Sequence, residues 1–196
     1  GMAAEVTDTA GRVSRTYADA LGRTTRSIQN FVDGVVSDAD DKSVGYTYNG
    51  AGVTALTAYL TGGGGQTTQY VYGVSQGAGS AIDSGDVVGL TYWPDATTGL
   101  ATSAEQEITT VNALGQTLTM TDRNGSAHTL TYDVLGRVVS DAVTTLGSGV
   151  DGAVRRIETA YDSQGNAYLV TSYDAASSGS IVNQVQRAYN GLGQMA

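Results

Sequence analysis

The feature that most constrains this chain is a four-residue phrase, Asp or Asn followed by any two residues and then Gly, which recurs eight times. In a type I turn, the first side chain accepts a hydrogen bond from the backbone two residues on, and a fourth-position Gly takes positive φ without a Cβ clash. Such turns close short hairpin loops. We predict structural turns at Asp8 to Gly11, Asp19 to Gly22, Asn49 to Gly52, Asn112 to Gly115, Asp122 to Gly125, Asp133 to Gly136, Asp162 to Gly165 and Asn190 to Gly193.

The segments between these turns carry the alternation of β-strands. Residues 117–121 alternate threonine with Leu118 and Met120, and residues 127–132 alternate in the same way. A period of two between turn signals predicts an antiparallel strand. The same reasoning places further strands at residues 12–17, 23–31, 45–48, 53–60, 67–72, 87–93, 105–111, 138–146, 154–161, 166–173 and 180–189.

The turns recur as part of a longer repeat. The glycines are separated by 11, 30, 63, 10, 11, 29 and 28 residues, and two short spacings add to 21. Tyr precedes four of the phrases, and Arg, Gln or Asn follows the Gly in six. This Tyr-Asp-x-x-Gly-Arg pattern, complete at residues 132–137, resembles the YD repeat of RHS-repeat proteins.

The resemblance implies both a fold and a role. It implies an all-β fold, a curved antiparallel sheet of consecutive hairpins that forms a segment of a hollow shell. Residues 1–196 would be a single repeat-built domain, cut from a longer protein. The implied function is a non-enzymatic scaffold that encapsulates or presents a toxin or effector domain lying outside this chain. Its relatives include teneurins and toxin-complex shell components, so a secreted or cell-surface bacterial location is expected, with neighbouring repeats as partners.

Composition agrees with many short strands and excludes several functions. There are 12 Tyr against one Phe and one Trp, and 27 Gly against one Pro, a profile typical of strands joined by glycine turns. The formal charge of -9 argues against nucleic-acid binding, which needs clustered Lys and Arg. No cysteine is present to form a disulfide or bind zinc, and no run is apolar enough for membrane insertion.

Candidate catalytic and metal-binding residues are few. His128 is the single histidine and lies mid-strand, where a packed structural role is favoured over catalysis. Glu105 and Glu107 share a strand face and could serve glycoside hydrolysis only if a cleft surrounded them. We therefore expect no catalytic residue, no cofactor and no metal. A calcium loop is the weaker reading of one acidic insertion, which holds Asp33, Asp38, Asp40 and Asp41.

Two further binding modes remain open. Tyrosines spaced two apart, such as Tyr70 and Tyr72, form rows that stabilise a sheet or, if exposed, stack on sugar rings. The alternative function is therefore a module for cell-surface carbohydrate, with Tyr92 and Trp93 as the candidate stacking pair. A single-layer sheet also leaves two edge strands unpaired, so a homodimer through sheet edges or a sheet face is a possible partner.

Overall fold

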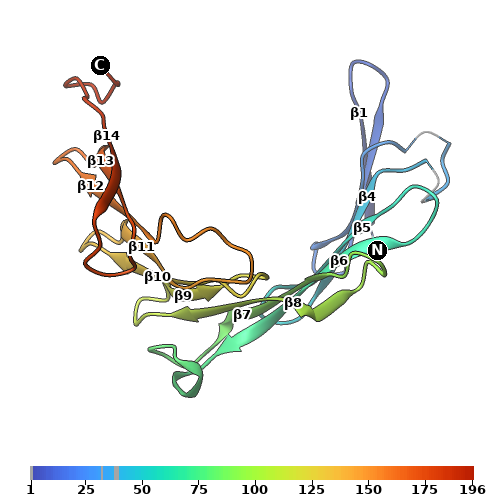
Figure 1. The fold of residues 1–196 in the computed structure, drawn as a ribbon. Helices are drawn as coiled ribbons and strands as arrows, with labels where there is room; N and C mark the ends of the chain where they lie inside the picture. The colour runs from blue at the N-terminus through green and yellow to red at the C-terminus, as the bar shows by residue number, and fades with distance from the viewer. Residues whose placement is uncertain (1, 32, 38–39) are drawn as a thin grey trace. The chain divides into compact units, whose positions relative to one another are not determined.

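The chain folds into fourteen antiparallel strands joined in sequence order (Figure 1). The structure is a computed structural model that describes residues 2–31, 33–37 and 40–196. Each strand pairs with its neighbours in the chain, so the sheet is a succession of hairpins, and the all-β antiparallel fold predicted from the repeats is confirmed. Among the described residues, one short helical turn interrupts the strands, η1 at Gln76–Ala78.

The strands lie close to the predicted segments. Their bounds are β1 Met2–Thr7, β2 Val13–Ala18, β3 Thr24–Ile28, β4 Ser43–Tyr48, β5 Val53–Tyr59, β6 Gly65–Val74, β7 Ser84–Pro94, β8 Ala101–Val111, β9 Thr117–Thr121, β10 Ala127–Tyr132, β11 Val138–Thr145, β12 Arg156–Tyr161, β13 Ala167–Tyr173 and β14 Ile181–Gln186. β1 has no counterpart among the predicted strands, and β3 ends three residues earlier than predicted.

The chain divides into two compact units, a division that the repeat pattern does not mark. The first unit comprises residues 1–74 and 84–107, and the second comprises residues 75–83 and 108–196. β8 therefore gives its first seven residues to the first unit and its last four to the second. Within each unit, alternate turns lie at the same end of the hairpins because successive strands run in opposite directions.

The hydrophobic core is small in both units. Among the described residues, the buried hydrophobic side chains are Ile28, Phe31, Val74 and Val111. In the second unit the loop that contains η1 lies against Val111: the Ser80 hydroxyl accepts a hydrogen bond from the Val111 amide at 3.1 Å, and the Ala81 amide donates to the Val111 carbonyl at 2.7 Å. Most side chains on the strands are half-buried, as expected of a sheet without a second layer.

The two faces of the second unit differ in polarity. His128 pairs with Met120 across β10 and β9, which places them on one face. Thr119 and Thr129 pair on the opposite face. Because side chains alternate along every strand, a one-residue shift of register would exchange these two faces.

Candidate functional site: contacts between successive turns

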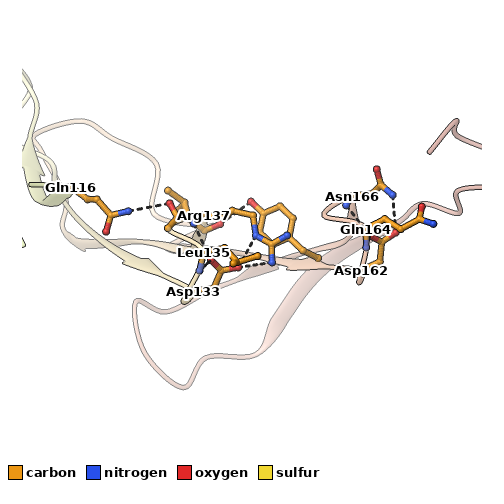
Figure 2. Close-up of polar contacts among 10 residues, drawn as sticks. Gln116, Asp133, Leu135, Arg137, Asp162, Gln164 and Asn166 are labelled. Carbon is orange, nitrogen blue, oxygen red and sulfur yellow. Dashed lines mark hydrogen bonds and ion pairs between the residues drawn. The ribbon is translucent and has the colours of Figure 1, made fainter. Parts of the chain in front are cut away.

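The repeated phrase forms a closed five-residue loop. In the Asp133 turn, one carboxylate oxygen accepts hydrogen bonds from the amides of Leu135 (2.9 Å) and Arg137 (3.0 Å), and the other accepts from the Arg137 Nε at 2.7 Å (Figure 2). The Gly136 amide donates to the Asp133 carbonyl at 3.0 Å, and the Asp133 amide donates to the Arg137 carbonyl at 2.9 Å. Gly136 has φ +80°, a left-handed conformation that disfavours any side chain.

Seven of the eight predicted turns share this loop. The first-position side chain accepts from the amides two and four residues on, and the Gly has positive φ. The φ values are +79° at Gly11, +79° at Gly22, +78° at Gly115, +81° at Gly125, +80° at Gly136, +90° at Gly165 and +74° at Gly193.

The Asn49 turn differs from the predicted geometry. Its side chain accepts from the amides of Ala51 (2.8 Å) and Gly52 (2.9 Å), and Gly52 does not adopt a positive φ. Glycine is required there for a steric reason instead, since a Cβ at Gly52 would overlap the Tyr72 hydroxyl. The loop is one residue shorter because the Asn49 amide bonds to the Gly52 carbonyl rather than to the following residue.

The tyrosines join each turn to the next turn at the same end of the hairpins. Each tyrosine lies at or near the end of a strand, and its hydroxyl donates to the carbonyl of the first residue after the preceding turn. We call this a tyrosine–turn contact. The five contacts are Tyr48 to Thr24 (2.6 Å), Tyr72 to Val53 (3.1 Å), Tyr132 to Thr117 (2.8 Å), Tyr161 to Val138 (3.0 Å) and Tyr189 to Ala167 (3.0 Å).

Arginine strengthens two of these contacts by stacking. The Arg23 guanidinium carbon lies 4.6 Å from the centroid of the Tyr48 ring, and that of Arg137 lies 4.2 Å from the centroid of the Tyr161 ring. A cation over an aromatic face contributes about 0.5–1 kcal/mol at exposed sites. The tyrosine hydroxyl bond adds about 1 kcal/mol. A complete Tyr-Asp-x-x-Gly-Arg repeat thus fixes one hairpin against the next through several modest interactions.

The residue after the Gly also reaches forward to the next turn. The Gln116 side chain donates to the Gly136 carbonyl at 3.1 Å (Figure 2), and the Arg23 Nη1 donates to the Asn49 carbonyl at 3.2 Å. The sequence pattern located these Arg and Gln positions, but it did not predict where their side chains would point. Their fixed offset after each Gly was the available signal, because a contact that repeats between successive hairpins needs the same residue at the same place in each.

The turn hydrogen bonds lower the pKa of several aspartates. At Asp133 the Arg137 side chain is the largest cause of the lowered pKa, whereas at Asp8 and Asp19 the backbone amides of Arg12 and Arg23 are the largest. The pKa of Asp162 is lowered chiefly by the Asn166 side chain, and the pKa of Asp95 by the Thr98 amide. Partial burial raises the pKa of the Tyr132 hydroxyl.

These aspartates predict a loss of stability in acid. A carboxyl with a lowered pKa in the folded state stabilises the fold above the unfolded pKa, about 3.9 for Asp, and this contribution is lost as pH falls through the folded pKa. We expect the urea midpoint to hold between about pH 7 and pH 5 and to fall below about pH 4. In Asp133→Asn the fall should be smaller, because an amide oxygen serves the same turn at Asn112. A midpoint that rose on acidification would contradict this account.

The structure does not bring Tyr92 and Trp93 together as one stacking surface. They are adjacent in β7 at regular register, Tyr92 opposite Gln69 in β6, so their rings point to opposite faces of the sheet. Two tyrosines of these rows have a structural role, because Tyr48 and Tyr72 make tyrosine–turn contacts. Tyr46, Tyr70 and Tyr72 line an apolar pocket of about 290 Å³ in the first unit, together with Val53, Leu56 and Val88.

The candidate catalytic residues belong to both units, with Glu105 and Glu107 in the first and His128 in the second. His128 Nδ1 lies 2.7 Å from Asp141 Oδ1 across β10 and β11, and no other hydrogen bond of the His128 side chain is found in the described part of the chain. A hydroxyl hydrogen-bonded to the His128 side chain is thus not found among these described residues. Glu105 and Glu107 share one face of β8 and are both partly exposed.

In the acidic insertion, two carboxylates cap the loop itself. Asp33 accepts from the Val35 amide and Asp41 from the Ser37 amide, each at 2.8 Å. Asp38 lies outside the described residues. Over residues 2–31, 33–37 and 40–196, no group of three or more His, Asp or Glu side chains is placed to hold a metal ion.

Together, the fold and the repeated contacts define a β-hairpin repeat protein in which tyrosine, aspartate, glycine and arginine couple successive turns. The chain is similar to the crystal structure of TcdB2-TccC3-Cdc42, with a TM-score of 0.60, 13% sequence identity and coverage of 94% of this chain. It therefore has the fold of an RHS-type repeat segment, and it spans 9% of the length of that chain.

A structure of the Photorhabdus luminescens Tc holotoxin pore matches with a TM-score of 0.35 and 10% identity, over 97% of this chain and 11% of that one. No protein-family model and no curated protein matches the sequence. No helix in the described part of the chain has the length and apolar character needed to span a membrane.

Proposed function

We propose that this chain is a wall segment of an RHS-type shell, a non-enzymatic scaffold that encapsulates or presents a toxin or effector domain outside these residues. The observation that carries the proposal is the series of tyrosine–turn contacts. Each contact fixes the position of one hairpin relative to the next, which is what a rigid wall needs. Secretion or display at a bacterial surface is part of the same proposal.

The small core supports a scaffold role over an enzymatic one. Four buried hydrophobic side chains among the described residues leave both faces of the sheet largely accessible, and no hydroxyl hydrogen-bonded to the His128 side chain is found among them. The strongest repeated interactions are those between backbone and turn side chains. These turn residues keep the same geometry from one hairpin to the next, which suits a scaffold.

The last strand offers an edge for a neighbouring repeat or a second copy. All six side chains of β14, Ile-Val-Asn-Gln-Val-Gln, are exposed, and none is charged. The Arg187 amide donates to the Tyr168 carbonyl in β13. Because alternate residues of a strand direct their backbone N–H and C=O groups to opposite sides, those of Gln184 and Gln186 point outward from the free edge of the sheet. In a protein of charge -9, an uncharged edge strand lets two chains approach without local repulsion.

Light scattering over a concentration series tests this proposal. We expect the molar mass to rise with concentration, and we expect Val182→Lys with Val185→Lys to restore the monomer, because charge on an edge strand blocks pairing. The matched control is Val134→Lys with Leu135→Lys, which removes two exposed apolar side chains and adds the same charge at a turn. A monomer at every concentration, or equal effects of both double variants, would count against a wall segment that pairs through β14.

A further inference from the structure

The turn at residues 122–126 carries a modification motif that the contacts between hairpins do not use. Of the seven asparagines, Asn124 alone is followed by any residue and then by Ser or Thr, in Asn124-Gly125-Ser126. Transferases that attach a glycan to asparagine need this pattern, with a residue other than Pro in the middle. Bacterial transferases of this class also need an acidic residue two positions earlier, where Asp122 stands. The turn meets both requirements.

The side chain of Asn124 is available in a way that those of the other turn asparagines are not. Asn124 lies at the exposed tip of the turn between β9 and β10, and its backbone amide donates to Asp122 Oδ1 at 2.9 Å. In three other turns the asparagine Nδ2 donates to a side-chain oxygen, at Asn112, Asn166 and Asn190. No hydrogen bond of the Asn124 side chain is found in the described part of the chain. Its nitrogen is therefore accessible to an enzyme.

Ser126, the third member of the motif, is closed off once the chain has folded. It is 3% exposed, and its hydroxyl oxygen accepts from the Gly147 amide at 3.1 Å. The same glycine lies against Asn124, since a Cβ at Gly147 would overlap the Asn124 carbonyl oxygen. Gly147 follows Ser126 by 21 positions. The motif thus stays uncovered until the connection at residues 146–155 has emerged and folded onto it.

We propose that Asn124 is an N-glycosylation site that is modified during export, before residues 146–155 close over Ser126. In the transfer, the Asn124 side-chain nitrogen bonds to the anomeric carbon of a lipid-linked oligosaccharide. The bond from that carbon to the lipid pyrophosphate breaks, the pyrophosphate leaves with the electron pair, and one amide proton passes to the transferase. The inference rests on the secretion that is part of the proposed function, because such transferases act on exported chains.

A glycan at Asn124 leaves the contacts between hairpins intact. Consecutive turns alternate between the two ends of the hairpins, so the turn at residues 122–126 lies at the end opposite the tyrosine–turn contacts of Tyr132 and Tyr161. A glycan is bulky and solubilising. At this end it covers the tips of the turns while the coupled end remains free to pack.

Expression behind a cleavable secretory leader, in a bacterium that carries the transferase and its lipid-linked donor, tests the site by mass spectrometry of peptides. We expect a glycopeptide that contains Asn124 from the exported chain and none from Asn124→Gln. Ser126→Thr should keep the glycan. Asp122→Asn should lower its occupancy severalfold, although the turn is kept, since Asn112 forms the same loop.

An acceptor tag fused after Ala196 reports whether the transferase is active in these cells. A glycosylated tag on a chain whose Asn124 is unmodified would overturn the proposal. Because the leader, the transferase and the donor are all supplied, that outcome would leave the wall-segment proposal, which is tested by molar mass, unaffected.

The order of modification and folding is tested on purified, unmodified protein with added transferase and donor. The folded chain should gain little glycan. Gly147→Ala should gain severalfold more, because the overlap with the Asn124 carbonyl opens the contact that covers Ser126. Ser148→Ala, at the exposed neighbouring position, is the matched control and should behave as the original chain does. Equal modification of the two variants, or of the folded and the exported chain, would contradict transfer before folding.

Discussion

Replacing Tyr161 with alanine is expected to lower the free energy of unfolding by about 2–3 kcal/mol, somewhat less than the ~3–5 kcal/mol of a fully buried aromatic residue. The change removes the hydroxyl bond to the Val138 carbonyl and the ring under Arg137. Tyr161→Phe keeps the ring and should cost about 1 kcal/mol, the value of the hydrogen bond. Urea unfolding followed by tyrosine fluorescence or circular dichroism measures both.

Tyr168→Ala provides the control for this prediction. Tyr168 lies in β13, is 37% exposed, and makes no tyrosine–turn contact. Its loss should cost no more than about 0.5 kcal/mol, as at other surface sites. If Tyr168→Ala and Tyr161→Ala destabilise the protein equally, the tyrosines stabilise the sheet only as general apolar surface, and the coupling of turns is not their role.

Replacing Gly99 with alanine should lower the free energy of unfolding by more than about 3 kcal/mol, through left-handed strain and overpacking together. Gly99 has φ +71°, and an added Cβ would overlap the Gly65 carbonyl oxygen. The backbone there is held on both sides, because the Thr67 amide donates to the Gly99 carbonyl and the Gly99 amide to the Asp95 carbonyl, each at 2.8 Å. A backbone shift that relieved the overlap would therefore break one of these two hydrogen bonds.

Two other glycines separate the causes. Gly62 has φ +94° with open space around it, so Gly62→Ala should show the conformational cost alone, about 1–2 kcal/mol. Gly85 lies in β7 without positive φ and has no atom within 4 Å of an added Cβ, so Gly85→Ala should be close to neutral. We expect the urea midpoint to be highest for Gly85→Ala, lower for Gly62→Ala and lowest for Gly99→Ala. If Gly99→Ala is as stable as Gly62→Ala, the overlap with the Gly65 carbonyl is relieved without cost.

Much of the fold could be predicted because its rules are local. The alternation in residues 117–121 and 127–132 and the Asp-x-x-Gly turns beside them are each set by a few consecutive residues, and the structure places β9 and β10 there. β1 was missed because Met2–Thr7 holds two alanines and no clear alternation. Its strand conformation depends on pairing with β2, a tertiary contact that periodicity does not report.

The site was only partly predictable, for a related reason. The sequence locates Tyr161 and Arg137 as members of one repeated pattern, but their contact joins residues 24 positions apart and depends on hairpin length. Tyr72 does not precede a turn phrase, so only its place near a strand end marked it in the sequence. The strand register is also beyond short-range patterns, which do not show that Ser140 pairs with Glu158 and Glu158 with Thr171.

Loop length is distributed unequally between the two ends of the hairpins. In the second unit, the turns at residues 112–116, 133–137 and 162–166 are all five residues long and touch their neighbours, while the connections at 146–155 and 174–180 are longer and lie at the other end. Extra residues there leave the spacing between tyrosine and turn untouched. Both longer connections contact their neighbours near their bases, where the Gly147 amide donates to the Ser126 hydroxyl and the Arg155 amide to the Tyr173 carbonyl. Only their tips are therefore free to diverge, so new loops can be grafted at residues 148–154 or 176–179 while these contacts between hairpins are kept.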